Sequence, residues 1–256
     1  EVDLTDYQTV RLLFQQDQPS LVIHCAALSR STACEQDPGL AHKLNVDVTR
    51  LLAELAAAIP FIFFSSDLVF DGREGHYDEA VSVLGVLDEV RKGEAEGCDG
   101  YVIACFGDPG LLAAREVARG PVLGIAEAAL HAASMVATGF SIVTTLTRTV
   151  GIARHLVESY GMTRYCRSIR ATDLAVLDLE EPNSSASAAI LEECRRAMRE
   201  DHADAIVLGC AGIADLAVRI GKDLHIPVID GVAVALKFIE ALVSLGLQTS
   251  KAGDLA

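Results

Sequence analysis

The sequence predicts an α/β fold with two pseudo-symmetric lobes, each holding a parallel sheet flanked by helices. Short apolar runs alternate with longer helical patterns almost throughout the 256 residues, which is typical of parallel sheets covered by helices. The sequence also repeats itself: Asp99-Gly-Tyr-Val-Ile-Ala-Cys105-Phe-Gly107 resembles Asp204-Ala-Ile-Val-Leu-Gly-Cys210-Ala-Gly212. A second similar pair follows, Pro121–Leu130 and Pro227–Leu236. Each unit therefore reads strand, Cys-x-Gly turn, helix, strand, helix.

The individual elements follow from these local patterns. We expect strands at 21–25, 61–64, 101–105, 122–125, 141–145, 166–169 or 174–177, 205–210 and 228–229. We expect helices near 6–16, 34–58, 83–96, 110–118, 126–138, 148–160, 184–202, 213–223 and 232–245. No linker rich in Pro, Gly or Ser separates two autonomous halves, so the chain should cross between lobes inside helices. This predicts a first lobe of residues 1–125 plus 232–256 and a second lobe of residues 126–231.

The repeat is incomplete at its front. Counting one period back from the strand that begins at Phe140 leads to residues 35–41, which have a polar helical pattern. The nearest predicted strand, 21–25, lies too early in the chain. We therefore expect residues 1–72 to be something other than the duplicated unit.

Composition narrows the class of protein. A net charge of −15 argues against nucleic acid and acidic membranes as partners, because phosphate binding needs clustered Lys and Arg. No apolar run reaches the ~18 residues of a membrane span. The seven cysteines are an odd number and include no Cys-x-x-Cys, which favours reduced thiols in the cytoplasm over disulfides. They also lack ligand spacing for a metal. A homo-oligomer is compatible with the sequence.

Cys105 and Cys210 stand at equivalent places in the repeat, each after a strand and before a helix. Two thiols placed equivalently on duplicated halves suggest a site with one proton-handling group on each face. A helix N-terminus stabilises a thiolate, and Gly107 and Gly212 allow the backbone to turn and present N–H groups to a developing oxyanion. Two thiols at equivalent places thus fit proton transfer on two faces.

From Glu74 to the C-terminus the sequence resembles the hydantoin and allantoin racemases of the Asp/Glu racemase superfamily. The matching words are Glu74-Gly-His-Tyr-Asp-Glu79, Ala104-Cys-Phe-Gly-Asp-Pro-Gly110, Val143-Thr-Thr-Leu-Thr-Arg148, Leu208-Gly-Cys-Ala-Gly212, Pro227-Val-Ile-Asp-Gly-Val232 and Gly246-Leu-Gln-Thr-Ser-Lys251. The resemblance implies two α/β lobes, no cofactor, and one cysteine on each face of a small cyclic ureide.

Residues 1–72 resemble an internal piece of a short-chain dehydrogenase/reductase of the dTDP-4-dehydrorhamnose reductase type. The words are Val2-Asp-Leu-Thr-Asp6, Pro19-Ser-Leu-Val-Ile-His-Cys-Ala-Ala27, Asn45-Val and Phe64-Ser-Ser-Asp-Leu-Val-Phe-Asp-Gly72. The glycine-rich dinucleotide turn is absent, and so is the Tyr-x-x-x-Lys pair, because Val81 stands four residues after Tyr77. The chain is thus expected to be a chimera in which a Rossmann-type fragment replaces the first strand–helix–strand unit.

The candidate site follows from the racemase resemblance. Cys105 and Cys210 would be the catalytic acid and base. Substrate would be held by residues beside the two cysteines, namely Phe106, Gly107, Ala211 and Gly212, and by Thr144 and Thr145 at the end of the strand before Leu146. Tyr77, in the Glu74–Glu79 motif, would also bind it. Asp108 is interpreted as a cap of the helix after Pro109, and Asp230 as a similar cap. His24 either reaches the cleft or is a structural histidine, whereas Cys98, Cys166 and Cys194 pack or lie at the surface.

The predicted activity is cofactor-independent racemisation of a 5-substituted hydantoin or allantoin. The main alternative is a folded but inactive fragment-exchange chimera. An NADP-dependent sugar-nucleotide reductase is remote without the glycine turn, and a one-cysteine decarboxylase or ring-opening relative is disfavoured because both thiols are present.

Overall fold

The computed structural model describes residues 2–24, 26–28, 34, 36–65, 79–174 and 186–255. Its contacts divide the chain into two compact units. Unit 1 contains Glu1–Ile103, Pro109–Val122 and Ile239–Ala256, whereas unit 2 contains Ala104–Asp108 and Leu123–Phe238. The lobe boundaries derived from the sequence stay a prediction.

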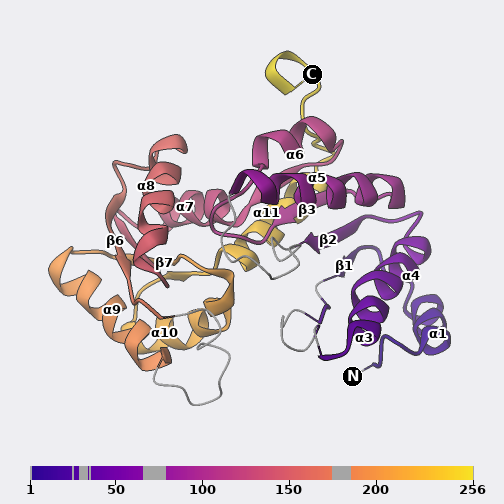
Figure 1. The fold of residues 1–256 in the computed structure, drawn as a ribbon, viewed down its shortest axis with the longest axis horizontal. Helices are drawn as coiled ribbons and strands as arrows, with labels where there is room; N and C mark the ends of the chain where they lie inside the picture. The colour runs from indigo at the N-terminus through magenta and orange to yellow at the C-terminus, as the bar shows by residue number, and fades with distance from the viewer. Residues whose placement is uncertain are drawn as a thin grey trace. The chain divides into compact units, whose positions relative to one another are not determined.

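Unit 1 is built on a four-stranded sheet in the order β1-β2-β3-β4, with parallel pairing of β1 to β2 and of β2 to β3. The strands are β1 (Val22–His24), β2 (Phe61–Ser65), β3 (Gly100–Ile103) and β4 (Val122–Gly124), which continues into unit 2. The helices are α1 (Tyr7–Asp17), α3 (Pro38–His42), the π-helix η1 (Lys43–Asp47), α4 (Val48–Leu55), α5 (Glu79–Glu96), α6 (Leu111–Val117) and the 3-10 helix η5 (Gly253–Leu255). Figure 1 shows α1 beside α4 and α5 beside α6, and both pairs are in contact. The helix predicted over 34–58 is thus interrupted by a π-helical segment.

Unit 2 contains a second parallel sheet, in the order β6-β5-β7-β8. The strands are β5 (Phe140–Thr144), β6 (Cys166–Ala171), β7 (Ala205–Leu208) and β8 (Val228–Ile229). The helices are α7 (Ile125–Val136), η2 (Thr147–Thr149), α8 (Val150–Ser159), α9 (Ala186–Glu200), η4 (Ala211–Leu216), α10 (Ala217–Leu224) and α11 (Gly231–Ser244), which ends in unit 1. Two parallel sheets flanked by helices confirm the predicted fold class, and β6 occupies the first of its two predicted positions.

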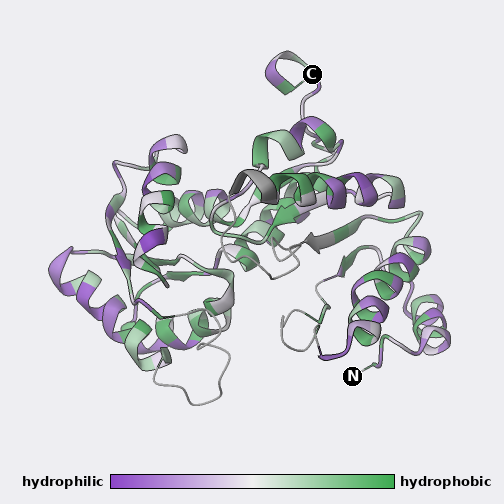
Figure 2. Ribbon diagram, viewed as in Figure 1, coloured by the Kyte–Doolittle hydropathy of each residue, from purple (hydrophilic) through white to green (hydrophobic). Residues whose placement is uncertain are grey.

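The central strands explain why the sequence reads as continuous apolar runs. Every residue of β3, β5 and β7 is buried, as expected for parallel strands covered on both faces. The helices are instead apolar on one side: in α9 the buried residues Ala186, Ile190, Cys194 and Ala197 recur every three or four positions, which places them on one face. Figure 2 shows that much of the rest of α9 is hydrophilic.

Each repeat begins with an aspartate that forms two hydrogen bonds with the backbone at the start of the neighbouring strand. In unit 1 the Asp99 carboxylate accepts a hydrogen bond from the Phe61 N–H (2.6 Å), and in unit 2 the Asp204 carboxylate accepts one from the Gly139 N–H (2.7 Å). The return bonds run from the Asp99 N–H to the Phe61 carbonyl and from the Asp204 N–H to the Gly139 carbonyl. Each aspartate thus aligns its own strand with the start of the neighbouring one.

These aspartate hydrogen bonds also identify the strand of unit 1 that corresponds to β5. β2 pairs with β3 as β5 pairs with β7, with Ile62 opposite Gly100 and Phe140 opposite Ala205. The counterpart of β5 is therefore β2, whereas counting one period back in the sequence led to residues 35–41 and to no strand. β1 occupies the edge position that β6 has in unit 2. The edge strand precedes the central strand in unit 1 and follows it in unit 2, so counting one period back could not find it.

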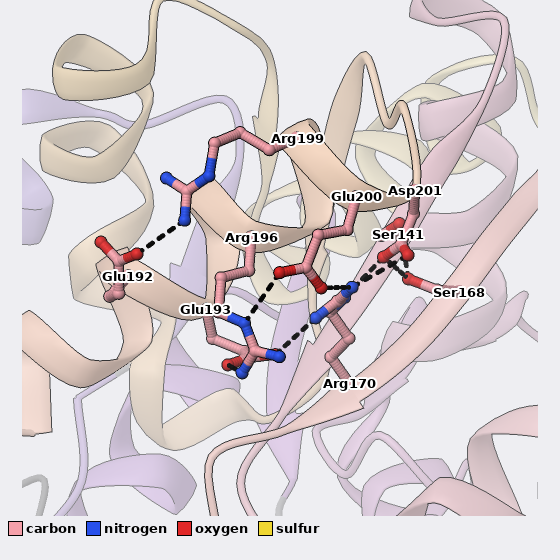
Figure 3. A network of polar contacts seen from close by, with 9 residues as sticks. All are labelled: Ser141, Ser168, Arg170, Glu192, Glu193, Arg196, Arg199, Glu200 and Asp201. Atoms are coloured by element: carbon pink, nitrogen blue, oxygen red, sulfur yellow. Dashed lines mark hydrogen bonds and ion pairs between the residues drawn. The ribbon is translucent and has the colours of Figure 1, made fainter.

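A polar network attaches the edge strand β6 to α9 (Figure 3). The Arg170 guanidinium donates to Asp201 through Nε and Nη2, to Glu193 through Nη1 (3.0 Å) and to Glu200 through Nη2 (2.7 Å). Ser168 donates to Asp201 as well. Only 13% of the Arg170 side chain is exposed, so one nearly buried cation binds three carboxylates, two of which, Glu193 and Glu200, also pair with Arg196.

The C-terminal segment holds the end of α6 within unit 1. Lys251 Nζ donates to the carbonyls of Arg115 (2.6 Å) and Glu116 (2.8 Å), which are among the last carbonyls of the helix. Thr249 donates through its N–H to Arg119 and through its hydroxyl to Gly120. A cation at a helix C-terminus is favourable because it faces the negative end of the helix dipole. The Gly246–Lys251 motif thus has a structural role.

None of the helices in the described part of the chain combines the length and apolar character that crossing a bilayer requires.

Candidate active site

The first cysteine lies in a tight turn directly after β3. The Asp108 N–H donates to the Cys105 carbonyl (3.0 Å), and the Gly107 N–H donates to the Cys105 Sγ (3.4 Å). Cys105 is half-buried and Phe106 is buried. A backbone donor directed at a sulfur stabilises negative charge there. The turn thus presents a thiol with a backbone N–H already oriented toward it.

The second cysteine lies directly before a helix. Cys210 is half-buried, has extended backbone and is the N-cap of η4, and the Ile213 N–H donates to its carbonyl (3.3 Å). Ala211 is half-buried and Gly212 is exposed. The expectation that both thiols precede a helix therefore holds closely only for Cys210, because α6 begins at Leu111 after the turn of Cys105.

Thr144, at the end of β5, lies against the Cys210 turn. Its hydroxyl donates to the Gly209 carbonyl (3.1 Å) and is 2.9 Å from the Thr149 hydroxyl. Gly209 must lack a side chain here, since a Cβ would lie 2.8 Å from the Thr144 Cβ. Thr145 is also buried, and its carbonyl accepts from the Thr172 hydroxyl (3.3 Å). Tyr77, also predicted to line the pocket, lies outside the described residues.

Asp108 has a role that differs from the predicted one. Its two carboxylate oxygens accept the N–H groups of Ala126 (3.0 Å) and Glu127 (2.8 Å), in the first turn of α7, and the Tyr160 hydroxyl also donates to it (2.8 Å). Burial raises the pKa of the Asp108 carboxyl to about 6, and these hydrogen bonds oppose the rise. The interpretation that Asp108 caps the helix after Pro109 is wrong: the N-cap of α6 is Gly110, without a side-chain bond.

A comparison of the two repeats could have indicated the contact between Asp108 and α7. Asp230, directly before α11, caps its own helix by accepting the N–H groups of Val232 (2.8 Å) and Ala233 (3.2 Å), as predicted. The corresponding residue of the first repeat is Gly124. A Cβ on Gly124 would lie 2.1 Å from the Asp108 Cγ. Where the second repeat has a capping carboxylate, the first has space for one that comes from the Cys105 turn.

Cys98, Cys166, Cys194 and His24 have structural roles. Cys98 and Cys194 are buried, which raises the pKa of each thiol to about 12, and partial burial raises the pKa of Cys166 to about 11. These thiols stay protonated at neutral pH. His24 is 3% exposed, its Nε2 is 2.8 Å from the Thr49 hydroxyl, and burial lowers its pKa. Of the two alternatives for His24, a place in the cleft or a structural role, these contacts favour the structural role.

Within the described residues, no group of three or more His, Cys, Asp or Glu side chains is arranged to hold a metal ion.

Comparisons with known proteins match this chain to two families, and the two matches overlap at residues 43–83. Residues 43–239 match the Asp/Glu/hydantoin racemase family, and residues 1–83 match the RmlD substrate binding domain. The hydantoin racemase of Rhizobium meliloti is 54% identical over 183 residues, which cover 72% of this chain and 76% of that protein.

Two solved structures are similar as well. The allantoin racemase of Klebsiella pneumoniae is 59% identical, with a TM-score of 0.69 over 72% of this chain and 75% of that one. The allantoin racemase of Pseudomonas fluorescens is 31% identical, with a TM-score of 0.72 over 92% and 95%. With two parallel sheets and the repeated cysteine turns, this chain belongs to the Asp/Glu/hydantoin racemase family.

Proposed function

We propose that this chain racemises a 5-substituted hydantoin or allantoin through a two-cysteine acid/base mechanism that needs no cofactor. The observation that carries the proposal is the equivalence of the two thiol turns, because Cys105 and Cys210 each follow a fully buried strand of the duplicated unit. Cys98, Cys166 and Cys194 do not stand at such equivalent places in the two repeats. The relatives compared above are named as hydantoin or allantoin racemases.

The chemistry needs one thiolate and one thiol. The thiolate removes the proton from C5 of the ring, and the electrons of the C–H bond delocalise onto the adjacent carbonyl oxygen. The opposite thiol then delivers its proton to the other face of C5. Substrate and product have the same formula, and the two sulfurs end with exchanged protonation states. Backbone N–H groups beside each cysteine would stabilise the enolate oxygen.

The surrounding residues would hold the ring. We infer that Phe106, Gly107, Ala211 and Gly212 contact it because they adjoin the two sulfurs in sequence, and that Tyr77 and Thr145 complete the wall. Thr144 would act on the Cys210 turn, since its hydroxyl is bound to the Gly209 carbonyl.

The test is loss of optical rotation from a single enantiomer of a 5-substituted hydantoin or of allantoin, measured against a buffer blank. Cys105→Ser and Cys210→Ser should each lower kcat by at least ~100-fold, the lower range for a positioned acid or base. Cys166→Ser is the matched control and should racemise like the wild type. Exchange of the C5 proton in D₂O adds a sharper test, since each serine variant should retain exchange for only one enantiomer, and the two variants should differ in which. If both variants racemise at the wild-type rate, the two-cysteine mechanism is wrong.

The alternative is a folded protein without activity. It is favoured by the match of residues 1–83 to the RmlD substrate binding domain and by the reversed chain order of β1 and β2 relative to β5 and β6. If the wild type is indistinguishable from the buffer blank with every substrate while it unfolds cooperatively in urea, this alternative replaces the proposed racemase.

A further inference from the structure

The turn that carries Cys105 is not positioned by β3 alone. The chain leaves unit 1 after Ile103, and residues Ala104–Asp108 cluster with unit 2, as does the segment with Cys210. The turn itself has an unusual backbone, since Asp108 has a φ of +45°, a conformation that L-residues other than Asn and Asp seldom adopt. Some interaction must hold the turn in this place and conformation.

The Asp108 carboxylate supplies that interaction. It is 5% exposed and takes both N–H groups of the first turn of α7, at Ala126 and Glu127, along with the Tyr160 hydroxyl. These partners come from two helices of unit 2, α7 and the end of α8. A carboxylate at a helix N-terminus is stabilised both by the unpaired N–H groups and by the helix dipole. The backbone N–H of the same residue bonds to the Cys105 carbonyl.

The second repeat positions its cysteine in a different way. The residue three places after Cys210 is Ile213, which is 1% exposed and lies in the hydrophobic core of unit 2, with Cys210 packed against that core. The helix cap is supplied separately by Asp230. The first repeat thus combines in Asp108 two roles that the second repeat divides between Ile213 and Asp230.

We propose that Asp108 is a positioning residue of the racemase reaction, which holds the Cys105 turn on α7 and thereby sets where the Cys105 sulfur lies in unit 2. Asp108 acts through the turn and has no contact with substrate in this mechanism. Its effect on turnover rests on the proposed function, whereas its effect on the Cys105 thiol does not.

Two variants disturb the same contact from opposite sides. Asp108→Asn replaces one acceptor oxygen by an NH₂ group, which cannot accept an N–H of α7. Gly124→Ala leaves Asp108 and Cys105 chemically intact, but its Cβ would occupy the place of the carboxylate. Tyr160→Phe is milder and removes only the hydroxyl donor. Asp230→Asn is the matched control, because it weakens an equivalent helix cap that is not attached to a cysteine turn.

The first readout is the alkylation rate of Cys105 relative to Cys210 with iodoacetamide, resolved by peptide mass spectrometry on folded protein. Asp108→Asn and Gly124→Ala should both change this ratio, Tyr160→Phe should change it in the same direction by less, and Asp230→Asn should leave it at the wild-type value. The second readout is steady-state kinetics: kcat should fall by ~10- to 100-fold in the first two variants, as expected for a misplaced catalytic group, with little change in KM.

An unchanged alkylation ratio in both Asp108→Asn and Gly124→Ala would overturn the proposal, and so would an equal change in Asp230→Asn. If either of the first two variants is unfolded, the ratio in Tyr160→Phe decides. A wild type that does not racemise any substrate refutes the proposed function but not the positioning role, because the thiol ratio is measured without substrate.

Discussion

Replacing Arg170 by methionine removes the cation through which β6 binds the carboxylates of α9 and of Asp201. Arg170 bonds to Asp201, Glu193 and Glu200, and its side chain is 13% exposed. Methionine retains much of the aliphatic packing but leaves Asp201, which is 18% exposed, with only the Ser168 hydroxyl as a described side-chain donor. Glu193 and Glu200 would keep Arg196 as an ion-pair partner, whereas Asp201 would lose the cation that binds it.

The expected cost follows from burial. Removing one partner of a fully buried ion pair destabilises a protein by about 3–5 kcal/mol. The site is partly exposed, and Glu193 (3.0 Å) and Glu200 (3.2 Å) both keep Arg196 as a partner, so we expect about 2–4 kcal/mol for Arg170→Met. Arg199→Met is the matched control within Figure 3, because its pair with Glu192 is 59% and 52% exposed. Exposed pairs contribute up to about 1 kcal/mol.

The measurement is urea unfolding monitored by circular dichroism, and we expect the m-value to be the same in all variants. The double variant Arg170→Met/Asp201→Asn should recover part of the lost stability, because it removes a carboxylate that has lost its partner. Arg170 also lowers the pKa of Asp201, so the stability from this contact is present above the unfolded pKa of about 3.9 and is lost as the pH falls below it. The reasoning is refuted if Arg170→Met costs no more than Arg199→Met.

Three further predictions concern helix ends. Burial raises the pKa of Asp108 from 3.8 to about 6, so its protonated form is favoured in the native state, and the resulting stability is complete below pH ~4 and is lost as the pH rises through about 6. Relative to Asp108→Asn, the unfolding free energy of the wild type should therefore fall by about 3 kcal/mol from pH 3 to pH 7, and a constant difference in urea titrations would contradict this. Gly124→Ala should cost about 2–4 kcal/mol, from a lost cap and a displaced buried carboxylate. Gly151→Ala, in a helix with open space around it, should be neutral or stabilising by up to about 1 kcal/mol, and equal melting temperatures of the two variants would refute this. Lys251→Met should lower stability by about 1 kcal/mol through the exposed C-terminus of α6, and protection of the amides in that helix from hydrogen exchange should fall; unchanged exchange would show that Lys251 does not hold it.

The sequence by itself determined the strands, most of the helices and the repeated cysteine turns. These features depend on local patterns: a buried parallel strand such as β7 must be apolar at every position, and a Cys-x-Gly turn after it reads the same wherever it occurs. The family could also be recognised from the sequence, because the motifs around Cys105 and Cys210 are contiguous segments.

Only the tertiary structure decided what distant segments do to each other. Parallel pairing is set between strands with no constraint on their chain order, so the sequence could not show that β1 lies at the edge and β2 in the centre. Asp108 was assigned to the helix nearest in sequence, but a carboxylate binds whichever N–H groups the fold brings within reach. In this fold those belong to α7, where Gly124 leaves the space for it.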